Sequence, residues 1–176
     1  MRHASDSPRR HADCHEPSLR DLLASILAEC GRSRRERGLP DVATTLDVPD
    51  EHRPATATVT LRRLLEPLLR RALEAADHPD AESDAPAVRE ILVTSVDEGG
   101  RLEIEVADSG PALSPAVRAW LAGDGDDMPE GAGLSLASVR AAVARIGGTV
   151  RGLNCPEGGV AITISLPHRR AERLAA

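Results

Sequence analysis

The segment Glu90–Gly110, EILVTSVDEGGRLEIEVADSG, predicts two neighbouring β-strands. Apolar and polar residues alternate along residues 90–96 and again along residues 102–106, as they do in strands with one buried face. Glu98-Gly99-Gly100 separates the two runs and supplies a tight turn. Because a short turn joins antiparallel strands, we expect an antiparallel hairpin here.

Helical patterns and a second hairpin surround this segment. The clearest amphipathic helix covers residues 61–76, with leucines on one face. A second helical pattern begins at Ser18, a candidate N-cap, and a third covers residues 134–146. Strand-like patterns cover residues 42–48, 149–153 and 160–166. This order predicts an α+β fold, a two-layer sandwich in which helices cover one face of a mixed, mainly antiparallel sheet. Hairpins between consecutive strands exclude a Rossmann fold.

Two features of the predicted helices have more than one explanation. Pro67 removes a backbone hydrogen bond in mid-helix, typically costing ~3 kcal/mol, and predicts a kink or a special local role. The arginine cluster at residues 32–37 is either a phosphate or partner patch or a solvated helix end, where cations are favoured.

The composition narrows the possible functions. The net charge of the 176 residues is −6 and there is no lysine, which disfavours nucleic acid as a partner and excludes lysine chemistry. The three cysteines form no CxxC pair, and the histidines are too scattered to predict zinc. No apolar run is long enough to cross a membrane. We therefore expect a soluble, cytoplasmic protein that binds no nucleic acid, no membrane and no zinc.

The pattern predicts one domain with two tails. Residues 1–17 contain three histidines and two prolines without periodicity, which is typical of a disordered tail. The domain is expected at residues 18–168, and residues 169–176 are expected to form a C-terminal tail.

Three motifs follow one another along the predicted domain. They are PLLRRA at residues 67–72, DSGPA at residues 108–112 and GAGLSLA at residues 131–137. In this order they resemble NLLxNA, DxGxG and GxGLGLA of the histidine-kinase-like ATPase domain, the superfamily of sensor histidine kinases, gyrase B, Hsp90 and MutL. The resemblance covers Ser18 to Pro167, and Leu166-Pro167 resembles the end of the family's closing hairpin. It implies the Bergerat-type ATP-binding fold, with ATP and Mg²⁺ as ligands.

The residues themselves support the adenine end of such a site. A carboxylate at a strand exit, Asp108, can accept a hydrogen bond from the adenine amino group, although aspartate there is also a common turn former. Gly110 would let the backbone pass close to the base. Gly131, Gly133 and Leu134 open a helix whose free N–H groups can face phosphates, or they only cap that helix.

The metal end departs from the family pattern. The resemblance places the magnesium-ligating asparagine at Arg71 and the asparagine before it at Pro67. A guanidinium has no oxygen to offer Mg²⁺, so metal-assisted phosphoryl transfer is in doubt. Arg71 either substitutes for the metal by pairing with phosphate or is a solvated arginine on a decayed site.

Two other residues and one segment are candidates for a role in catalysis or in closing the site. Glu66 is one position out of register for the general base of the gyrase branch, so we do not expect it to be catalytic. His15-Glu16 is similar to a phosphoacceptor motif, but His15 fits a disordered tail better. Residues 111–130 form the expected lid over the phosphates, in which Asp124–Asp127 is acidic and Trp120 is either a remnant of the family's aromatic motif or a buried anchor.

The resulting hypothesis is a stand-alone histidine-kinase-like ATP-binding domain. It binds ATP or ADP and, if active as a histidine or serine protein kinase, transfers phosphate to a separate protein in two-component signalling. Such a partner would be a response regulator, another phosphoacceptor, or a sigma or anti-sigma factor. The alternative is a catalytically inactive pseudokinase or anti-sigma-like interaction module. A gyrase-type ATP hydrolase would depend on Glu66, and the oligomeric state is left open.

Overall fold

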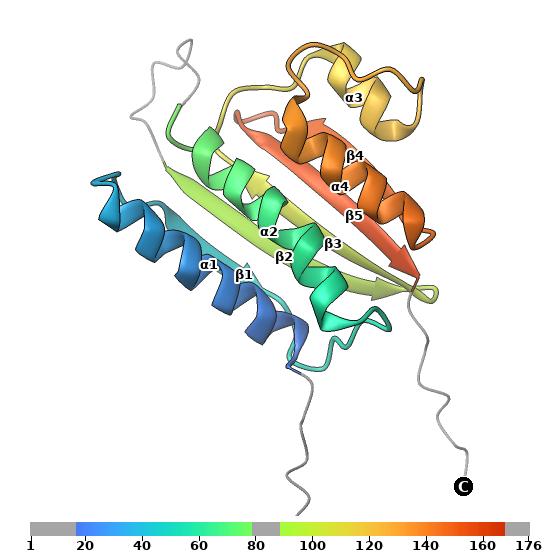
Figure 1. Ribbon diagram of the computed structural model, residues 1–176, viewed down its shortest axis with the longest axis horizontal. Coiled ribbons are helices and arrows are strands. Elements are labelled where there is room, and N and C mark those ends of the chain that lie inside the picture. The colour runs from blue at the N-terminus through green and yellow to red at the C-terminus, as the bar shows by residue number, and fades with distance from the viewer. Residues whose placement is uncertain (1–16, 79–88, 168–176) are drawn as a thin grey trace, which may run out of the picture.

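The computed structural model describes residues 17–78 and 89–167 (Figure 1). In chain order the elements are α1 (Leu19–Glu36), β1 (Ala43–Asp47), α2 (Thr58–Ala75), β2 (Glu90–Glu98), β3 (Arg101–Asp108), α3 (Pro115–Ala122), α4 (Gly133–Arg145), β4 (Thr149–Asn154) and β5 (Val160–Pro167). Each predicted helix and strand is present. Apart from Pro17, the two predicted tails, including His15, lie outside the described residues.

The strands form a mixed sheet in the order β1-β2-β3-β5-β4. β1 pairs in parallel with β2, and the other three pairings are antiparallel. The β2–β3 hairpin turns at Gly99 and Gly100, whose φ values of 60° and 82° favour glycine. In Figure 1, α1, α2 and α4 lie side by side on one face of the sheet. The predicted α+β fold, a mainly antiparallel sheet covered by helices on one face, is therefore confirmed.

The core is aliphatic, with α2 at its centre. Leucine recurs on α2 at helical spacing, so one face is buried against the sheet. The buried residues of that face are Leu61, Leu64, Leu65, Leu68, Leu69, Ala72 and Leu73. α2 continues through Pro67 from Thr58 to Ala75. Trp120, the single Phe, Tyr or Trp residue of the sequence, lies on the buried side of α3, in agreement with its interpretation as an anchor.

Alternation along β3 positions the candidate site. Every second residue is buried, beginning with Leu102 and continuing through Ile104 and Val106. Asp108 is the next residue in this series and ends the strand. Because alternate side chains of a strand point to the same face, the Asp108 carboxylate lies on the core side of the sheet, beneath the helices.

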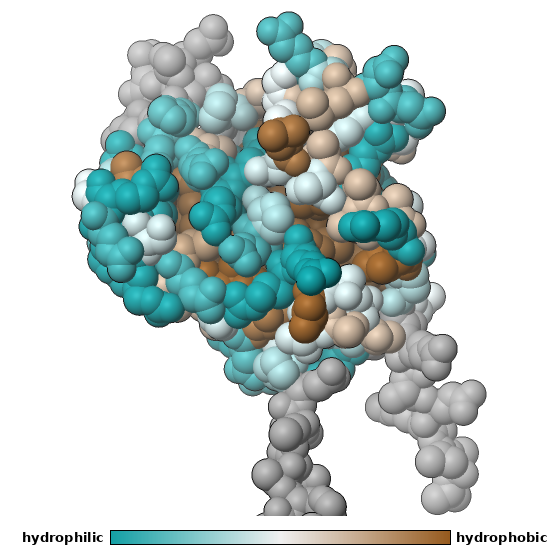
Figure 2. All heavy atoms as spheres, in the orientation of Figure 1, coloured by the Kyte–Doolittle hydropathy of each residue, from teal (hydrophilic) through white to brown (hydrophobic). Residues whose placement is uncertain are grey.

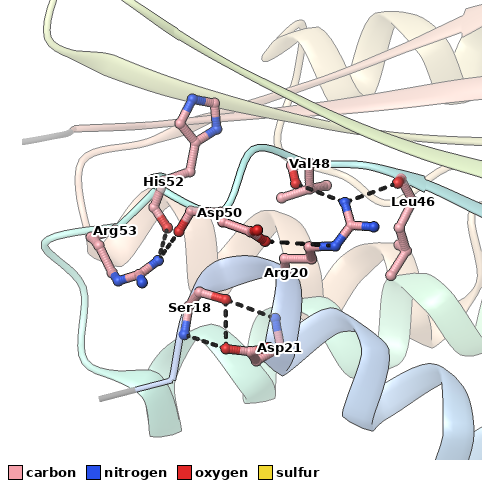
Figure 3. A network of polar contacts seen from close by, with 8 residues as sticks. All are labelled: Ser18, Arg20, Asp21, Leu46, Val48, Asp50, His52 and Arg53. Atoms are coloured by element: carbon pink, nitrogen blue, oxygen red, sulfur yellow. Dashed lines mark hydrogen bonds and ion pairs between the residues drawn. The ribbon is translucent and has the colours of Figure 1, made fainter. Parts of the chain in front are cut away.

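Polar contacts fix both ends of α1. Ser18 caps the helix through a capping box with Asp21, which confirms its predicted role. Figure 3 shows the Arg20 guanidinium donating to the carbonyl oxygens of Leu46 and Val48, at 3.3 and 3.0 Å. These bonds fasten the start of α1 to the end of β1 and the residue after it.

At the other end of α1, Arg34 is buried and paired with Asp77. Its two terminal nitrogens donate to the two Asp77 carboxylate oxygens at 2.8 and 2.6 Å. They also donate to the carbonyl oxygens of Leu73 and Pro40, at 3.2 and 2.9 Å. One member of the predicted arginine cluster is therefore a structural link from α1 to the residues that follow α2.

The helix-side surface is mainly hydrophilic. Figure 2 shows apolar residues there only as small, separate patches. No helix of the described segments is both long and apolar enough to cross a membrane.

Candidate functional site

The Asp108 carboxylate is buried at the end of β3. Its side chain is 1% exposed, and its backbone pairs with Ile91 of β2 and Val160 of β5. One carboxylate oxygen, Oδ1, accepts a hydrogen bond from the Gly110 N–H at 2.9 Å. An acidic group in such a place is costly unless it has partners, which makes it a candidate for a functional role.

The second carboxylate oxygen is held by Arg71. Arg71 extends from α2, and its Nη1 donates to Asp108 Oδ2 at 2.6 Å. The arginine side chain is 17% exposed. Burial raises the pKa of the Asp108 carboxyl, and the Arg71 charge and the Gly110 N–H offset this only in part. Arg71 is therefore the counter-ion of the carboxylate that we expected at the base.

Gly110 is required by a contact inside the protein. A Cβ at this position would lie 2.6 Å from the Ala75 Cβ and 2.7 Å from its carbonyl carbon. Real side chains do not approach so closely, so glycine lets the strand exit pass against the end of α2. The sequence predicts that Gly110 lets the backbone pass close to the base, and the contact with Ala75 is a further reason for glycine at this position.

Two residues that support the strand exit have no signal in the sequence motifs, Gly159 and Asn154. A Cβ on Gly159 would collide with the Asp108 carbonyl oxygen, so the β4–β5 turn packs directly on the strand exit. Asn154 accepts a hydrogen bond from the Leu113 N–H at 2.8 Å and donates one to the Leu113 carbonyl at 3.0 Å. The first contact holds the backbone at Asp108, and the second holds the segment that follows the strand exit.

The glycine motif opens α4 without a side-chain cap. Gly131 and Gly133 have φ values of 87° and 71°, and a Cβ on either would meet open space. Glycine is therefore needed here for backbone conformation, not for close packing. Ala132, the N-cap residue, makes no side-chain hydrogen bond, and the Leu134 side chain is 82% exposed. An uncapped helix start of this kind leaves N–H groups available to an anion.

These elements meet at one end of the sheet. In Figure 1 the C-terminal end of α2, the exit of β3 and the start of α4 lie at the same end, and α2 packs beside α4. The structure thus brings Arg71, Asp108 and Gly110 together and places the start of α4 at the same end of the domain.

Glu66 lies elsewhere. Its carboxylate accepts a hydrogen bond from Arg70 Nη2 at 2.9 Å, on the side of α2 that faces α1. There it lines a pocket of about 120 Å³ that also includes Cys30 and Arg34. It makes no described contact with Asp108.

The residues at the metal end do not fit Mg²⁺. Arg71 occupies the position at which the resemblance places the magnesium ligand, and its guanidinium offers only donors. Within residues 17–78 and 89–167, no group of three or more His, Cys, Asp or Glu side chains is arranged to hold a metal ion.

The lid segment is fastened to α4 by one arginine. The Arg140 guanidinium lies 4.7 Å from the centroid of the Trp120 ring. Its Nη2 also donates to the Gly125 carbonyl at 2.9 Å. Asp124, Asp126 and Asp127 are exposed beside this contact. An arginine of α4 therefore links the helix that follows the glycine motif to both α3 and the acidic loop.

The sequence matches the family model of the histidine kinase-, DNA gyrase B-, and HSP90-like ATPases over residues 56–170. It is 36% identical to the sensor protein KdpD of Escherichia coli over 95 residues. This match covers 51% of this chain and 11% of KdpD. Two Mycobacterium tuberculosis proteins also match. The probable sensor histidine kinase HK is 29% identical over 174 residues, covering 94% of this chain and 41% of HK. The sensor histidine kinase component HK1 is 31% identical over 159 residues, covering 88% of this chain and 82% of HK1.

The fold resembles solved histidine kinase structures. The catalytic domain of ThkA, in a nucleotide-free form, superposes with a TM-score of 0.66 at 18% identity and covers 85% of this chain and 93% of that domain. Full-length ShkA in complex with AMPPNP superposes with a TM-score of 0.62 at 24% identity, covering 86% of this chain and 30% of ShkA. At these identities the likeness establishes a shared fold.

Proposed function

Since the chain belongs to the family of histidine kinase-, DNA gyrase B- and HSP90-like ATPases, we propose that it binds an adenine nucleotide between α2, the exit of β3 and the start of α4. The observation that carries this proposal is the buried Asp108 carboxylate, which ends β3 and lies on the core side of the sheet. Asp108 would accept a hydrogen bond from the adenine amino group. Gly110 holds the carboxylate in place, and the N–H groups that follow Gly131 and Gly133 would face the phosphates.

The relatives support a role in signal transduction. The relatives named above are a sensor protein, a probable sensor histidine kinase and a sensor histidine kinase component, and ShkA was solved with AMPPNP. This chain spans only 11% of KdpD and 41% of HK, but it spans 82% of HK1, which is described as a component. We therefore propose that the chain works as a separate ATP-binding component in the cytoplasm. Its phosphate would go to another protein, such as a response regulator.

A second candidate function is favoured by the Arg71–Asp108 ion pair. Both oxygens of the Asp108 carboxylate already have partners, and no oxygen ligand stands at position 71. These are features expected of a domain that has lost catalysis and regulates a partner protein by binding it. Such a pseudokinase or anti-sigma-like module would keep the fold without needing a nucleotide.

Thermal unfolding with a panel of nucleotides separates the two functions. A ligand that binds only the folded state adds about 2.7 kcal/mol of stability at a concentration 100 times its dissociation constant. We expect ATP and ADP to raise the Tm, and GTP to raise it less because guanine lacks the amino group at the position that Asp108 would bind. The Asp47→Asn variant, altered on the exposed edge strand β1, should respond as the wild type does. A Tm that no nucleotide moves, with or without Mg²⁺, would favour the interaction module.

A further inference from the structure

The described residues include two arginine–aspartate pairs, each with one buried member, that are built differently. Arg34 makes four hydrogen bonds, two of them to Asp77 and two to backbone carbonyls. Among the described residues Arg71 makes one, from Nη1 to Asp108 Oδ2. A guanidinium has five N–H donors in a fixed fork. Arg34 is therefore held in one position, whereas most donors of Arg71 have no partner within residues 17–78 and 89–167.

Exposure differs in the same sense. The Arg34 side chain is 8% exposed and that of Arg71 is 17% exposed, although Arg71 holds the more deeply buried carboxylate. The Arg71 guanidinium is therefore paired with Asp108 while part of the arginine side chain is exposed to solvent. A partner with a stronger negative charge could draw it away without breaking other hydrogen bonds of the described residues.

A bound nucleoside would meet a carboxylate whose two oxygens both have donors. Asp108 Oδ1 accepts from the Gly110 N–H and Oδ2 accepts from Arg71, so a base amino group either shares an oxygen with one of these donors or displaces the donor. Displacing the Arg71 guanidinium from Asp108 leaves this cation without its counter-ion, which is unfavourable near a buried site. A phosphate group on the same ligand would remove this penalty by giving the guanidinium a new, charge-assisted partner.

From this arrangement we infer that Arg71 determines which ligands the site accepts: it moves from Asp108 to the phosphates of the bound nucleotide. This inference rests on the proposed nucleotide site and names its ligand class. The site takes adenosine di- and triphosphates without a divalent cation and discriminates against adenosine, which carries no phosphate.

The surroundings agree with this assignment. The acidic loop Asp124–Asp127 belongs to the segment expected to cover the phosphates, and its negative charge would repel a triphosphate unless a cation intervenes. Arg140 is engaged with the Trp120 ring and the Gly125 carbonyl. The Arg71 guanidinium supplies a positive charge at this end of the site, where the described residues offer no group of metal ligands.

Isothermal titration calorimetry in EDTA tests the inference on the full chain. ADP and adenosine are titrated into the wild type and into Arg71→Ala, with Arg70→Ala as the control because Arg70 loses the same charge one residue away, in an exposed pair with Glu66. We expect the wild type to bind ADP about tenfold or more tightly than adenosine, as one charge-assisted hydrogen bond allows. Arg71→Ala should lower the affinity for ADP and raise the affinity for adenosine, while Arg70→Ala should change neither affinity.

A measurement on the wild type keeps the test decisive if Arg71→Ala fails to fold. The Arg71 guanidinium NMR signal, identified by its absence in Arg71→Lys, should shift when ADP is added in EDTA and should not shift with adenosine. An unmoved Arg71 signal at saturating ADP would overturn the inference.

The outcomes also separate this inference from the proposed function. Nucleotide binding that appears only with Mg²⁺, or that is equal in the wild type and Arg71→Ala, refutes the role of Arg71 and leaves the nucleotide site standing. The absence of binding by ATP, ADP and adenosine under every condition refutes the site itself.

Discussion

Arg71 of α2 and Asp108 of β3 are joined by a 2.6 Å hydrogen bond across the interface between the helix layer and the sheet. The sequence presents the two residues as opposite ends of a nucleotide site, one near the metal and one near the base. In the folded chain they are in contact, so one substitution affects both ends. The carboxylate and its counter-ion must therefore be tested separately.

Asp108→Asn tests the carboxylate. The variant keeps the shape of the side chain but removes the charge, and it places an amide that can donate where the adenine amino group also donates. We expect ATP affinity to fall about tenfold or more, the loss expected for one hydrogen bond to a charged group. Titration calorimetry measures it, with Asp47→Asn as the control. Equal ATP affinity in Asp108→Asn and wild type would exclude the carboxylate as the base contact.

Arg71→Asn tests the metal end. The asparagine oxygen gives Mg²⁺ a ligand that the guanidinium cannot offer. We expect wild-type affinity for ATP to be similar in Mg²⁺ and in EDTA, and the variant to bind ATP better in Mg²⁺ than in EDTA. Calorimetry in the two buffers provides the comparison. Metal-free binding that is undiminished in Arg71→Asn would rule out the arginine as the phosphate contact.

Gly110→Ala should disturb the strand exit. The added Cβ would meet both the side chain and the backbone of Ala75, and such overpacking typically costs about 1–3 kcal/mol. Urea unfolding gives the free energy of unfolding. Gly31→Ala is the control, because its Cβ would meet only the Arg35 guanidinium at 3.5 Å and alanine is the better helix former by about 1 kcal/mol.

A double variant sharpens this test. Ala75→Gly removes one of the atoms that would collide with the new Cβ but leaves the Ala75 backbone in place. We therefore expect Ala75→Gly to restore only part of the stability lost in Gly110→Ala. Full restoration would mean that the backbone contact does not limit the strand exit.

The Arg34–Asp77 pair should make stability depend on acid. Hydrogen bonds from Arg34 hold the pKa of the Asp77 carboxyl below its ordinary value. The stabilisation from this pair is therefore complete at a pH above the pKa of aspartate in the unfolded chain, about 3.9. It is lost as the pH falls through the lower pKa that Asp77 has in the folded protein. Asp77→Asn should cost about 3–5 kcal/mol at pH 7, because it leaves a buried guanidinium unpaired.

Urea unfolding over a pH series measures this difference. The stability of Asp77→Asn relative to wild type should improve as the pH falls below the ordinary aspartate range, since the wild type then loses the same ion pair. A difference that stays constant down to the most acidic pH would show that Asp77 is not the group involved.

Arg140→Ala should loosen the lid segment. It removes a cation–π contact worth about 0.5–2 kcal/mol together with the bond to the Gly125 carbonyl. Trp120 is the single tryptophan, so its fluorescence reports on this segment directly. We expect a shifted emission spectrum and faster proteolysis between residues 122 and 130. Arg145→Ala, at the exposed last turn of α4, should show neither change.

Local patterns in the sequence predicted much of this arrangement. Alternation along residues 102–106 predicted the strand whose buried series Asp108 continues, and glycines at residues 99, 100, 131 and 133 marked the hairpin turn and the helix start. The contact between Arg71 and Asp108 was not predictable, because it joins residues 37 positions apart and depends on how far a long side chain reaches. For the same reason the roles of Asn154 and Arg140 carry no local signal.

A crystal structure with a non-hydrolysable ATP analogue, grown without a divalent cation, tests the central claim most directly. We predict the adenine amino group within hydrogen-bonding distance of the Asp108 carboxylate and the Arg71 guanidinium turned from Asp108 to a phosphate. An analogue bound elsewhere, or a saturated crystal in which Arg71 still holds Asp108 and no base lies beside it, would contradict the account.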